Sequence, residues 1–199
     1  MGQHAYIIRR FRLGLLDLLV RGSVRPSGRA RQRRLTQRNA LWANAEEEVF
    51  QPLKGGWAQV PRTLPMIASL IDELGGREKP GRLYLALWSY DFGEGYIEVP
   101  DPARVALEAG YTSNRAERTF SERMKILRDQ GFIKAKALGA REFGHVLLVD
   151  PHRVVVALRA SSPERIAEAW WSTFEARCSA IGISLLELQP IAAVVGGEQ

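Results

Sequence analysis

The sequence predicts a mainly helical protein with a small antiparallel β-hairpin, which is an α+β fold, with helical extensions at both ends. Three observations indicate this fold. Apolar residues recur at the three- and four-residue spacing of amphipathic helices through much of the chain after residue 63. Glycines stand where two of these helices would end, at Gly110 and Gly131. Two short segments of alternating character, 132–136 and 143–149, follow Gly131 and are typical of a hairpin.

The first elements precede this central region, in residues 41–80. Residues 41–56 contain an acidic cluster, 46–48, which is most simply a solvated face. Residues 57–62 are expected to be extended, because the residue before Pro61 avoids helical backbone angles. Thr63 is expected to cap a helix that ends at Gly75 and Gly76. The apolar positions of this helix are Leu64, Ile67, Ala68, Ile71 and Leu74.

Residues 81–160 are predicted to form one domain. Its expected elements are a helix over 82–90, a strand over 96–99, a helix over 101–109, a turn over 110–113, a longer helix over 114–130, and the two hairpin strands joined by 139–142. For the two helices on either side of this turn to pack together, particular kinds of residue are needed at fixed positions. Ala106 is small enough for the helices to cross, and Gly110 tolerates the positive φ that the turn needs. Tyr111 is expected to point inward.

The second helix of this pair has a buried and an exposed face. Phe120, Met124 and Leu127 continue the buried stripe. Thr112, Ser113 and Asn114 are expected to cap the helix, and Asn114 with Glu117 has capping-box spacing. The opposite face presents Ser113, Asn114, Arg115, Arg118, Thr119 and Glu122, with Lys125 and Asp129 further along.

This exposed face suits the major groove of duplex DNA. Arginine can bond guanine, asparagine can bond adenine, and hydroxyls and a helix N-terminus can bond phosphate. In the hairpin, Lys134 and Lys136 are expected to clamp phosphates, and Arg141, expected at the tip, to probe the minor groove. The predicted DNA-binding residues are therefore Thr112, Ser113, Asn114, Arg115, Arg118, Thr119, Glu122, Lys125, Lys134, Lys136 and Arg141.

These residues resemble the winged helix-turn-helix superfamily over roughly residues 57–150. The arrangement is similar to that of MarR-like regulators and of plasmid or phage replication proteins, in which a glycine and an aliphatic residue end the recognition helix and open the wing. Here that segment is 128–133, with Gly131, Phe132 and Ile133. The extension 60–64 before an apolar helix looks more like the replication proteins. The resemblance implies a double-stranded DNA-binding protein that reads the major groove with 114–130 and clamps phosphates with 132–149. Its role would be transcription regulation, or plasmid or mobile-element replication or partition.

One departure from that arrangement is the length of the recognition helix, which is expected to be about one turn longer than usual. An alternative reading is a protein-interaction module without DNA binding, in which Arg123 and Arg128 pair with Glu117 or Asp129.

Charge is distributed unevenly along the chain, whose net charge is +6. Residues 1–38 contain ten arginines and one acid, a net of +9, so the other 161 residues sum to −3. Residues 111–145 contain eight basic and four acidic side chains, a net of +4, on the elements expected to touch phosphates.

The two ends of the chain are predicted to differ. Residues 1–40 form a basic arm, with an amphipathic helix between Tyr6 and Leu19 and disorder over 21–34. The arm is either a DNA-binding element, a solvated tail or an N-terminus placed too far upstream. At the other end, residues 161–199 comprise a helix and a tail, with Ser162 capping the helix and Pro163 opening it. Its apolar stripe (Ile166, Trp170, Phe174, Cys178 and Ile181) is expected to pack on its own domain or to form a homodimer through 163–181.

Enzymatic activity, a metal site and a cofactor are not expected. The three histidines lack metal-ligand spacing, and the acids between Asp91 and Asp101 fall in a predicted loop. The single cysteine, Cys178, allows no internal disulfide and favours a cytoplasmic location, nucleoid- or plasmid-associated. The apolar run at 13–20 is too short to span a bilayer, and no signal peptide is expected.

Overall fold

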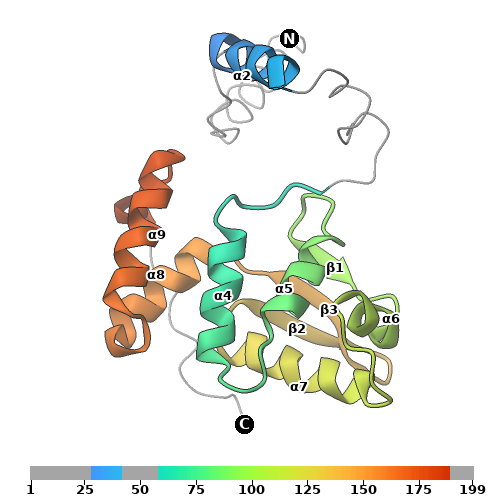
Figure 1. Ribbon diagram of the computed structural model, residues 1–199. Helices are drawn as coiled ribbons and strands as arrows, with labels where there is room; N and C mark the ends of the chain where they lie inside the picture. The colour runs from blue at the N-terminus through green and yellow to red at the C-terminus, as the bar shows by residue number, and fades with distance from the viewer. Residues whose placement is uncertain (1–27, 42–57, 189–199) are drawn as a thin grey trace, which may run out of the picture. The chain divides into compact units, whose positions relative to one another are not determined.

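The computed structural model describes residues 28–41 and 58–188, which belong to two units that are described separately (Figure 1). The first unit contains helix α2 (Gly28–Leu41), and the second contains the other described helices and the strands. The amphipathic helix expected between Tyr6 and Leu19, the acidic cluster at 46–48 and the tail beyond residue 188 lie outside the described residues.

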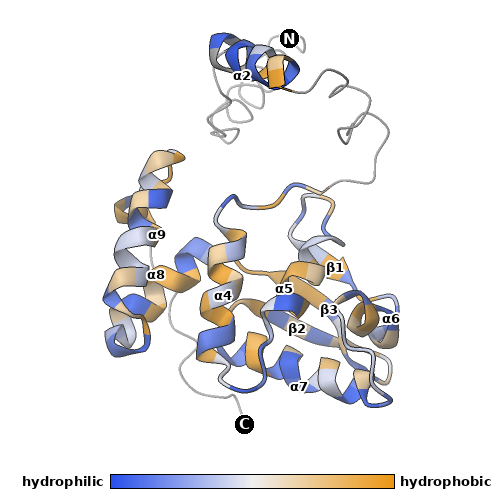
Figure 2. Cartoon of the chain, in the orientation of Figure 1, coloured by the Kyte–Doolittle hydropathy of each residue, from blue (hydrophilic) through white to orange (hydrophobic). Residues whose placement is uncertain are grey.

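Helix α2 is built mostly from polar residues, as its largely hydrophilic colouring shows (Figure 2). The prediction of disorder over 21–34 is wrong for residues 28–34, which are helical. Arginine, glutamine, leucine and alanine are all good helix formers, so local propensity here outweighs the repulsion between like charges.

The second unit is mainly helical with a small antiparallel sheet, which confirms the α+β prediction (Figure 1). In chain order its elements are α4 (Leu64–Leu74), α5 (Gly81–Trp88), β1 (Tyr96–Glu98), α6 (Pro102–Glu108), α7 (Ala116–Asp129), β2 (Ile133–Leu138), β3 (Arg141–Leu148), α8 (Pro151–Ser161), the 3₁₀ turn η2 (Pro163–Arg165), α9 (Glu168–Ala180) and the 3₁₀ turn η3 (Leu185–Glu187). The three strands are ordered β1-β3-β2, so the last strand in sequence is central. Strand β1 was expected at this place, and its partner is β3.

The hairpin of β2 and β3 turns through Gly139 and Ala140, and Gly139 has the positive φ of 60° that such a tight turn favours. Arg141 is the first residue of β3 and pairs with Leu138 across this two-residue turn, so it lies at the end of the hairpin. The register of the β2–β3 pairing shifts between Lys136 and Leu138. A Cβ added to Gly144 would lie 2.2 Å from the Cβ of Leu138. Glycine at 144 therefore permits the close approach that the irregular register requires.

The turn between α6 and α7 is formed as predicted, but the predicted N-terminal cap of α7 is not. Asp101 caps α6 by accepting a hydrogen bond from the Ala103 amide at 2.9 Å, and Gly110 has φ +84°. Helix α7 begins at Ala116, so the predicted capping box of Asn114 is wrong. The Ser113 hydroxyl instead accepts a long bond of 3.3 Å from the Arg115 amide, one residue outside the helix. The helix has 14 residues and not the predicted 17.

One apolar core joins α4, the central elements and α9. Its buried members include Leu64, Ile67, Leu70, Tyr84, Leu87, Val105, Phe120, Met124, Leu127, Phe132, Phe143, Val146 and Phe174. Thr63 does not cap α4, because its backbone angles are helical and not extended. Its buried hydroxyl instead forms a 2.7 Å hydrogen bond with Nε2 of His152, which ties the start of α4 to α8.

The C-terminal helix begins later than predicted. Ser162 makes no capping bond with its side chain and is followed by η2, and α9 starts at Glu168. Phe174 is fully buried with its ring 6.1 Å from that of His152, and Cys178 is 1% exposed. The apolar stripe of α9 therefore packs on its own chain. Within the described ranges, no helix is long and apolar enough to cross a membrane.

Candidate nucleic-acid interface

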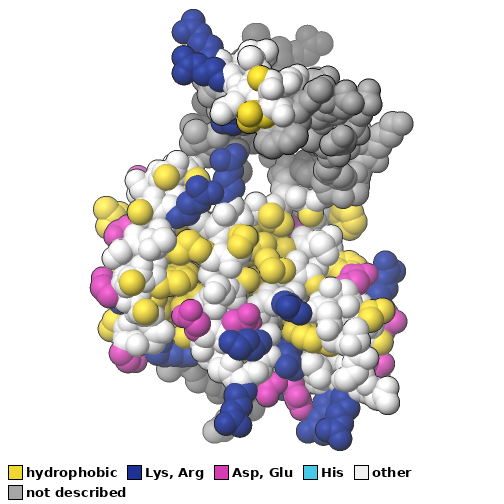
Figure 3. Space-filling view, viewed as in Figure 1, with side chains coloured by type: hydrophobic (Ala, Val, Ile, Leu, Met, Phe, Trp, Pro, Cys, Tyr) yellow, Lys and Arg dark blue, Asp and Glu magenta, His cyan; other side chains and the backbone are white. Residues whose placement is uncertain are grey.

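The predicted groove-reading residues gather around the N-terminal half of α7. Thr112, Ser113, Asn114, Arg115, Arg118 and Lys125 are exposed, and Thr119 and Glu122 are partly exposed. Phe120 and Met124 face the core on the opposite side of the helix. Basic and acidic side chains are interspersed over the lower part of the molecule, where α7 lies (Figure 3).

Arg118 is already paired within the helix. Its Nε lies 2.8 Å from Oε1 of Glu122, one turn along, and both side chains face solvent. Hydrogen bonding and the charge of Arg118 hold the pKa of the Glu122 carboxyl below its usual value. Contact between Arg118 and a phosphate therefore requires this exposed pair to open, and exposed pairs contribute little to stability.

A single carboxylate of β3 binds two basic residues of α7. Glu142 lies 3.1 Å from the guanidinium of Arg128 and 3.7 Å from Nζ of Lys125. Arg128 also contacts Asp129 at 3.4 Å and lies 5.5 Å from the ring centroid of Phe143. These contacts fasten the second half of α7 to the hairpin, and the expected pairing of Arg128 with Asp129 is confirmed.

Arg123 belongs to the interior side of α7. Its guanidinium forms an ion pair of 3.2 Å with Glu78 and lies 4.8 Å from the ring centroid of Tyr111. Its Nη1 donates to the carbonyl of Thr119 at 3.4 Å. The side chain therefore stabilises the joint between α7 and the segment before α5, and its pairing with Glu117, which was the alternative, does not occur.

Four basic residues of the predicted site have no carboxylate within ion-pair distance among the described residues: Arg115, Lys134, Lys136 and Arg141. Arg115 directly precedes α7, where the first amide groups of the helix have no partner within it. An exposed cation beside the positive end of a helix dipole is suited to a phosphate oxygen.

The lysines of the hairpin lie on a different face from α7. Ile133 of β2 and Val146 of β3 are buried against the helices, so the alternating positions Lys134 and Lys136 point from the other side of the sheet. Nη1 of Arg141 donates to the carbonyl oxygens of Val99 and Pro100 at 2.6 and 2.9 Å, which turns the side chain toward the segment after β1. The predicted site is therefore divided between two surfaces.

The charge of the second unit is concentrated on one segment. Residues 58–188 contain 17 basic and 17 acidic side chains and are neutral overall. Because residues 111–145 carry +4, the remainder of this unit carries −4. This asymmetry within the second unit is independent of the basic arm.

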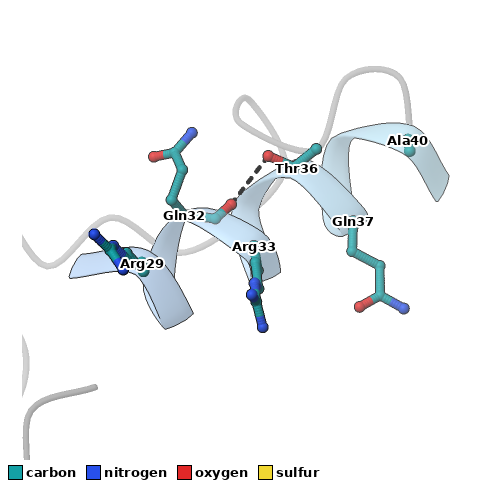
Figure 4. Close-up of a pocket in the computed structure, with 6 residues that line it drawn as sticks. All are labelled: Arg29, Gln32, Arg33, Thr36, Gln37 and Ala40. Atoms are coloured by element: carbon teal, nitrogen blue, oxygen red, sulfur yellow. Dashed lines mark hydrogen bonds between the residues drawn. The ribbon is translucent and has the colours of Figure 1, made fainter. Parts of the chain in front are cut away.

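Helix α2 has a polar face of its own. Arg29, Gln32, Arg33, Thr36, Gln37 and Ala40 recur at helical spacing along a shallow open depression (Figure 4). The Thr36 hydroxyl donates to the carbonyl of Gln32 at 3.0 Å, and no acid occurs in the helix. With five arginines and no acid, the helix has a positive potential, which attracts anions.

Among residues 28–41 and 58–188, no cluster of three or more His, Cys, Asp or Glu side chains could hold a metal ion. Burial raises the pKa of the Cys178 thiol to about 11, which disfavours the thiolate needed of a nucleophile.

The sequence reasoning missed Tyr96 and His145, which lie on the same sheet face as the two lysines. Tyr96 lies on β1 and His145 on β3, and their side chains are joined by a 2.8 Å hydrogen bond. The alternation of exposed and buried positions in each strand was visible in the sequence, but the pairing of β1 with β3 was not.

No protein-family model, curated protein or solved structure matches the chain.

Proposed function

We propose that the protein binds double-stranded DNA through a winged helix-turn-helix made of α5, β1, α6, α7 and the β2–β3 hairpin. The observation that supports this most is the exposed N-terminal face of α7 behind the Gly110 turn, with Ser113, Asn114, Arg115 and Arg118 together. An α-helix presented in this manner fits the major groove.

The turn geometry supports this assignment. Gly110 ends α6 with a positive φ, and the Tyr111 amide donates to the carbonyl of Ala106 at 2.9 Å. Ala106 is fully buried where the helices meet. Both helices are therefore held by backbone bonds and close packing, and α7 offers a fixed outer face.

The electrostatics support it as well. The segment 111–145 is the basic part of an otherwise acidic unit, and Arg115 lies unpaired among described residues beside the amide groups that open α7. Binding would release counterions from the phosphate that Arg115 neutralises, so affinity would fall with salt.

The test uses the full chain with a labelled duplex in a salt series, read by fluorescence anisotropy. Arg115→Ala/Arg118→Ala is expected to lower affinity by about tenfold and to flatten the salt slope by about 0.9, for the one phosphate that Arg115 holds while Arg118 stays paired with Glu122. The matched control is Arg77→Ala/Arg165→Ala, which removes the same charge from exposed positions elsewhere. Equal losses in the two double variants would overturn the proposal.

A protein-interaction module is the second candidate, and the pairing of Arg118, Lys125 and Arg128 with carboxylates favours it. A surface whose charges are mutually satisfied is suited to a protein partner. Under this alternative, the same titration gives a duplex affinity that depends on the arm and is unchanged by the loss of Arg115 and Arg118.

The wider role extends the proposal: a cytoplasmic, nucleoid- or plasmid-associated factor in transcription regulation, replication or partition. Reading two half-sites requires a dimer. Because Phe174 and Cys178 are buried within the chain, a contact through 163–181 would use Trp170 and Trp171, which are only partly buried. Sedimentation at increasing concentration, with and without Trp170→Ser, tests this contact.

A further inference from the structure

The sheet has a solvent-facing side that the duplex-binding proposal does not use. Directly paired residues share a face, so register places six side chains on it in two rows. The rows are Tyr96–Leu147–Lys134 and Glu98–His145–Lys136, and we call these six residues the outer sheet face. The neighbouring Ile97, Val146 and Ile133 are at most 3% exposed, which confirms that alternate positions point to the core.

Two rings form a flat surface at the centre of this face. The hydroxyl of Tyr96 lies 2.8 Å from Nδ1 of His145, and the ring planes differ by only 23° with centroids 6.0 Å apart. Because the hydrogen bond joins the edges of two nearly parallel rings, the rings lie side by side and not one above the other. Tyr96 is 46% exposed and Leu147 beside it is 44% exposed, so the surface is open to solvent.

Charge on the outer sheet face runs from acidic to basic across the strands. Glu98 lies on β1, whereas Lys134 and Lys136 lie on β2, with the rings between them. Neither lysine has a carboxylate within ion-pair distance among the described residues. Neighbouring strands are about 4.8 Å apart, which is within reach of a lysine side chain from the rings.

We infer that the outer sheet face binds single-stranded DNA, with an unpaired base stacked on Tyr96 and His145 and the adjacent phosphates on Lys134 and Lys136. Aromatic rings on an open sheet bind any base, because every base has a π-face, and lysines beside them hold the backbone. Glu98 repels phosphate, so the backbone lies toward β2 and the base toward β1. A duplex cannot use this surface in this manner, because its bases are already stacked.

This inference is separate from duplex binding by α7, because it depends on different residues and a different state of the DNA. It assigns the two lysines, predicted as clamps for a duplex, to a single strand. One chain would then hold duplex on α7 and an opened strand on the sheet.

The test compares two labelled strands of about 12 nucleotides, a length suited to one such surface: oligo(dT), and a strand of abasic sites with the same phosphates. The full chain is used, because both strands carry the same phosphates, which matches their charge attraction to the basic arm. Wild-type protein is expected to bind oligo(dT) about tenfold more tightly than the abasic strand, which is typical of stacking one base. Equal affinities for the two strands would overturn the inference, and this comparison requires only the wild-type protein.

Variants then test whether the preference for oligo(dT) over the abasic strand comes from the two rings. Tyr96→Thr/His145→Thr removes both rings but keeps residues that favour strands, and it is expected to abolish the preference for bases. Leu147→Thr is the matched control, because it lies on the same face with similar exposure and has no ring, and it is expected to keep the preference. A preference that persists in the double variant, or disappears equally in the control, overturns the inference.

Two further measurements separate base stacking from phosphate contacts and from loss of folding. Lys134→Gln/Lys136→Gln is expected to flatten the salt dependence by about 1.4, two phosphates at 0.7 each for a single strand, without changing the preference for bases. Thermal unfolding checks that each variant is folded, and His145→Thr alone replaces the double variant if the latter unfolds. Arg115→Ala/Arg118→Ala, measured in parallel, is expected to weaken duplex binding only, so the two proposals fail or succeed independently.

Discussion

Opening the Arg118–Glu122 pair should strengthen duplex binding. Glu122→Gln removes the carboxylate that lies 2.8 Å from Nε of Arg118 and leaves the backbone of α7 unchanged, because glutamine is an equally good helix former. The freed guanidinium can then neutralise one more phosphate. One added phosphate contact steepens the salt slope by about 0.9, so the ratio of affinities measured at about 50 and 200 mM salt should grow about 3.5-fold.

The assay is a duplex titration by fluorescence anisotropy at several salt concentrations. Glu108→Gln is the matched control, since Glu108 forms the same one-turn pair with Arg104 at 3.1 Å, on α6 outside the predicted interface. Both variants gain the same net charge, but only Glu122→Gln should steepen the slope. The effect should also vanish in an Arg118→Ala background, because the two changes act on one contact. An identical change of slope in both glutamine variants would refute the reasoning, since net charge alone would then explain it.

Three further predictions concern stability. Thr63→Val preserves shape but leaves Nε2 of buried His152 without its partner at 2.7 Å, and should lower the free energy of unfolding by about 1–3 kcal/mol in a denaturant titration. Gly144→Ala places a Cβ 2.2 Å from that of Leu138 and should cost about 1–3 kcal/mol by overpacking, read as a lower thermal midpoint. Asp150 should make unfolding depend on pH. Burial raises the pKa of its carboxyl, but hydrogen bonds from His152 more than offset this and hold the pKa below its usual value. Its stabilising effect should therefore be complete above the usual aspartate pKa and be lost as the pH falls through the lowered value.

Each of these three stability predictions has a control variant. Thr173→Val removes an exposed hydroxyl that bonds the carbonyl of Ala169, and should change stability by less than about 0.5 kcal/mol. Gly139→Ala meets no atom within 4 Å and tests backbone strain at φ +60° without a clash. Asp150→Asn should be less stable at neutral pH and lose this acid-dependent component. Equal effects of Thr63→Val and Thr173→Val, or a pH profile unchanged by Asp150→Asn, would contradict the structural argument.

The order of elements in residues 63–149 followed from local signals. Gly110 and Gly131 mark helix ends because both adopt positive φ. The side of α7 that is buried followed from helical spacing, since Phe120 and Met124 recur one turn apart. These features are local, so the sequence alone was sufficient to predict them.

What could not be predicted depends on contacts between distant residues. The bond between Thr63 and His152 joins residues 89 positions apart, and it replaces a cap that looked plausible locally. The direction of Arg141 depends on carbonyls of the segment after β1. The capping residue of α7 depends on where the turn ends, which differs by two residues from the pattern. At α2, composition predicted disorder although helix propensity was high.

The central claim, that α7 holds duplex DNA, is tested most directly by hydrogen–deuterium exchange of the full chain with and without a duplex. The amides at the start of α7 have no partner within the helix, so bound phosphates should slow their exchange. The account predicts protection over residues 112–125 that fades with added salt and is lost in Arg115→Ala/Arg118→Ala. Protection confined to α2 and the arm, with residues 112–125 unchanged, would contradict it.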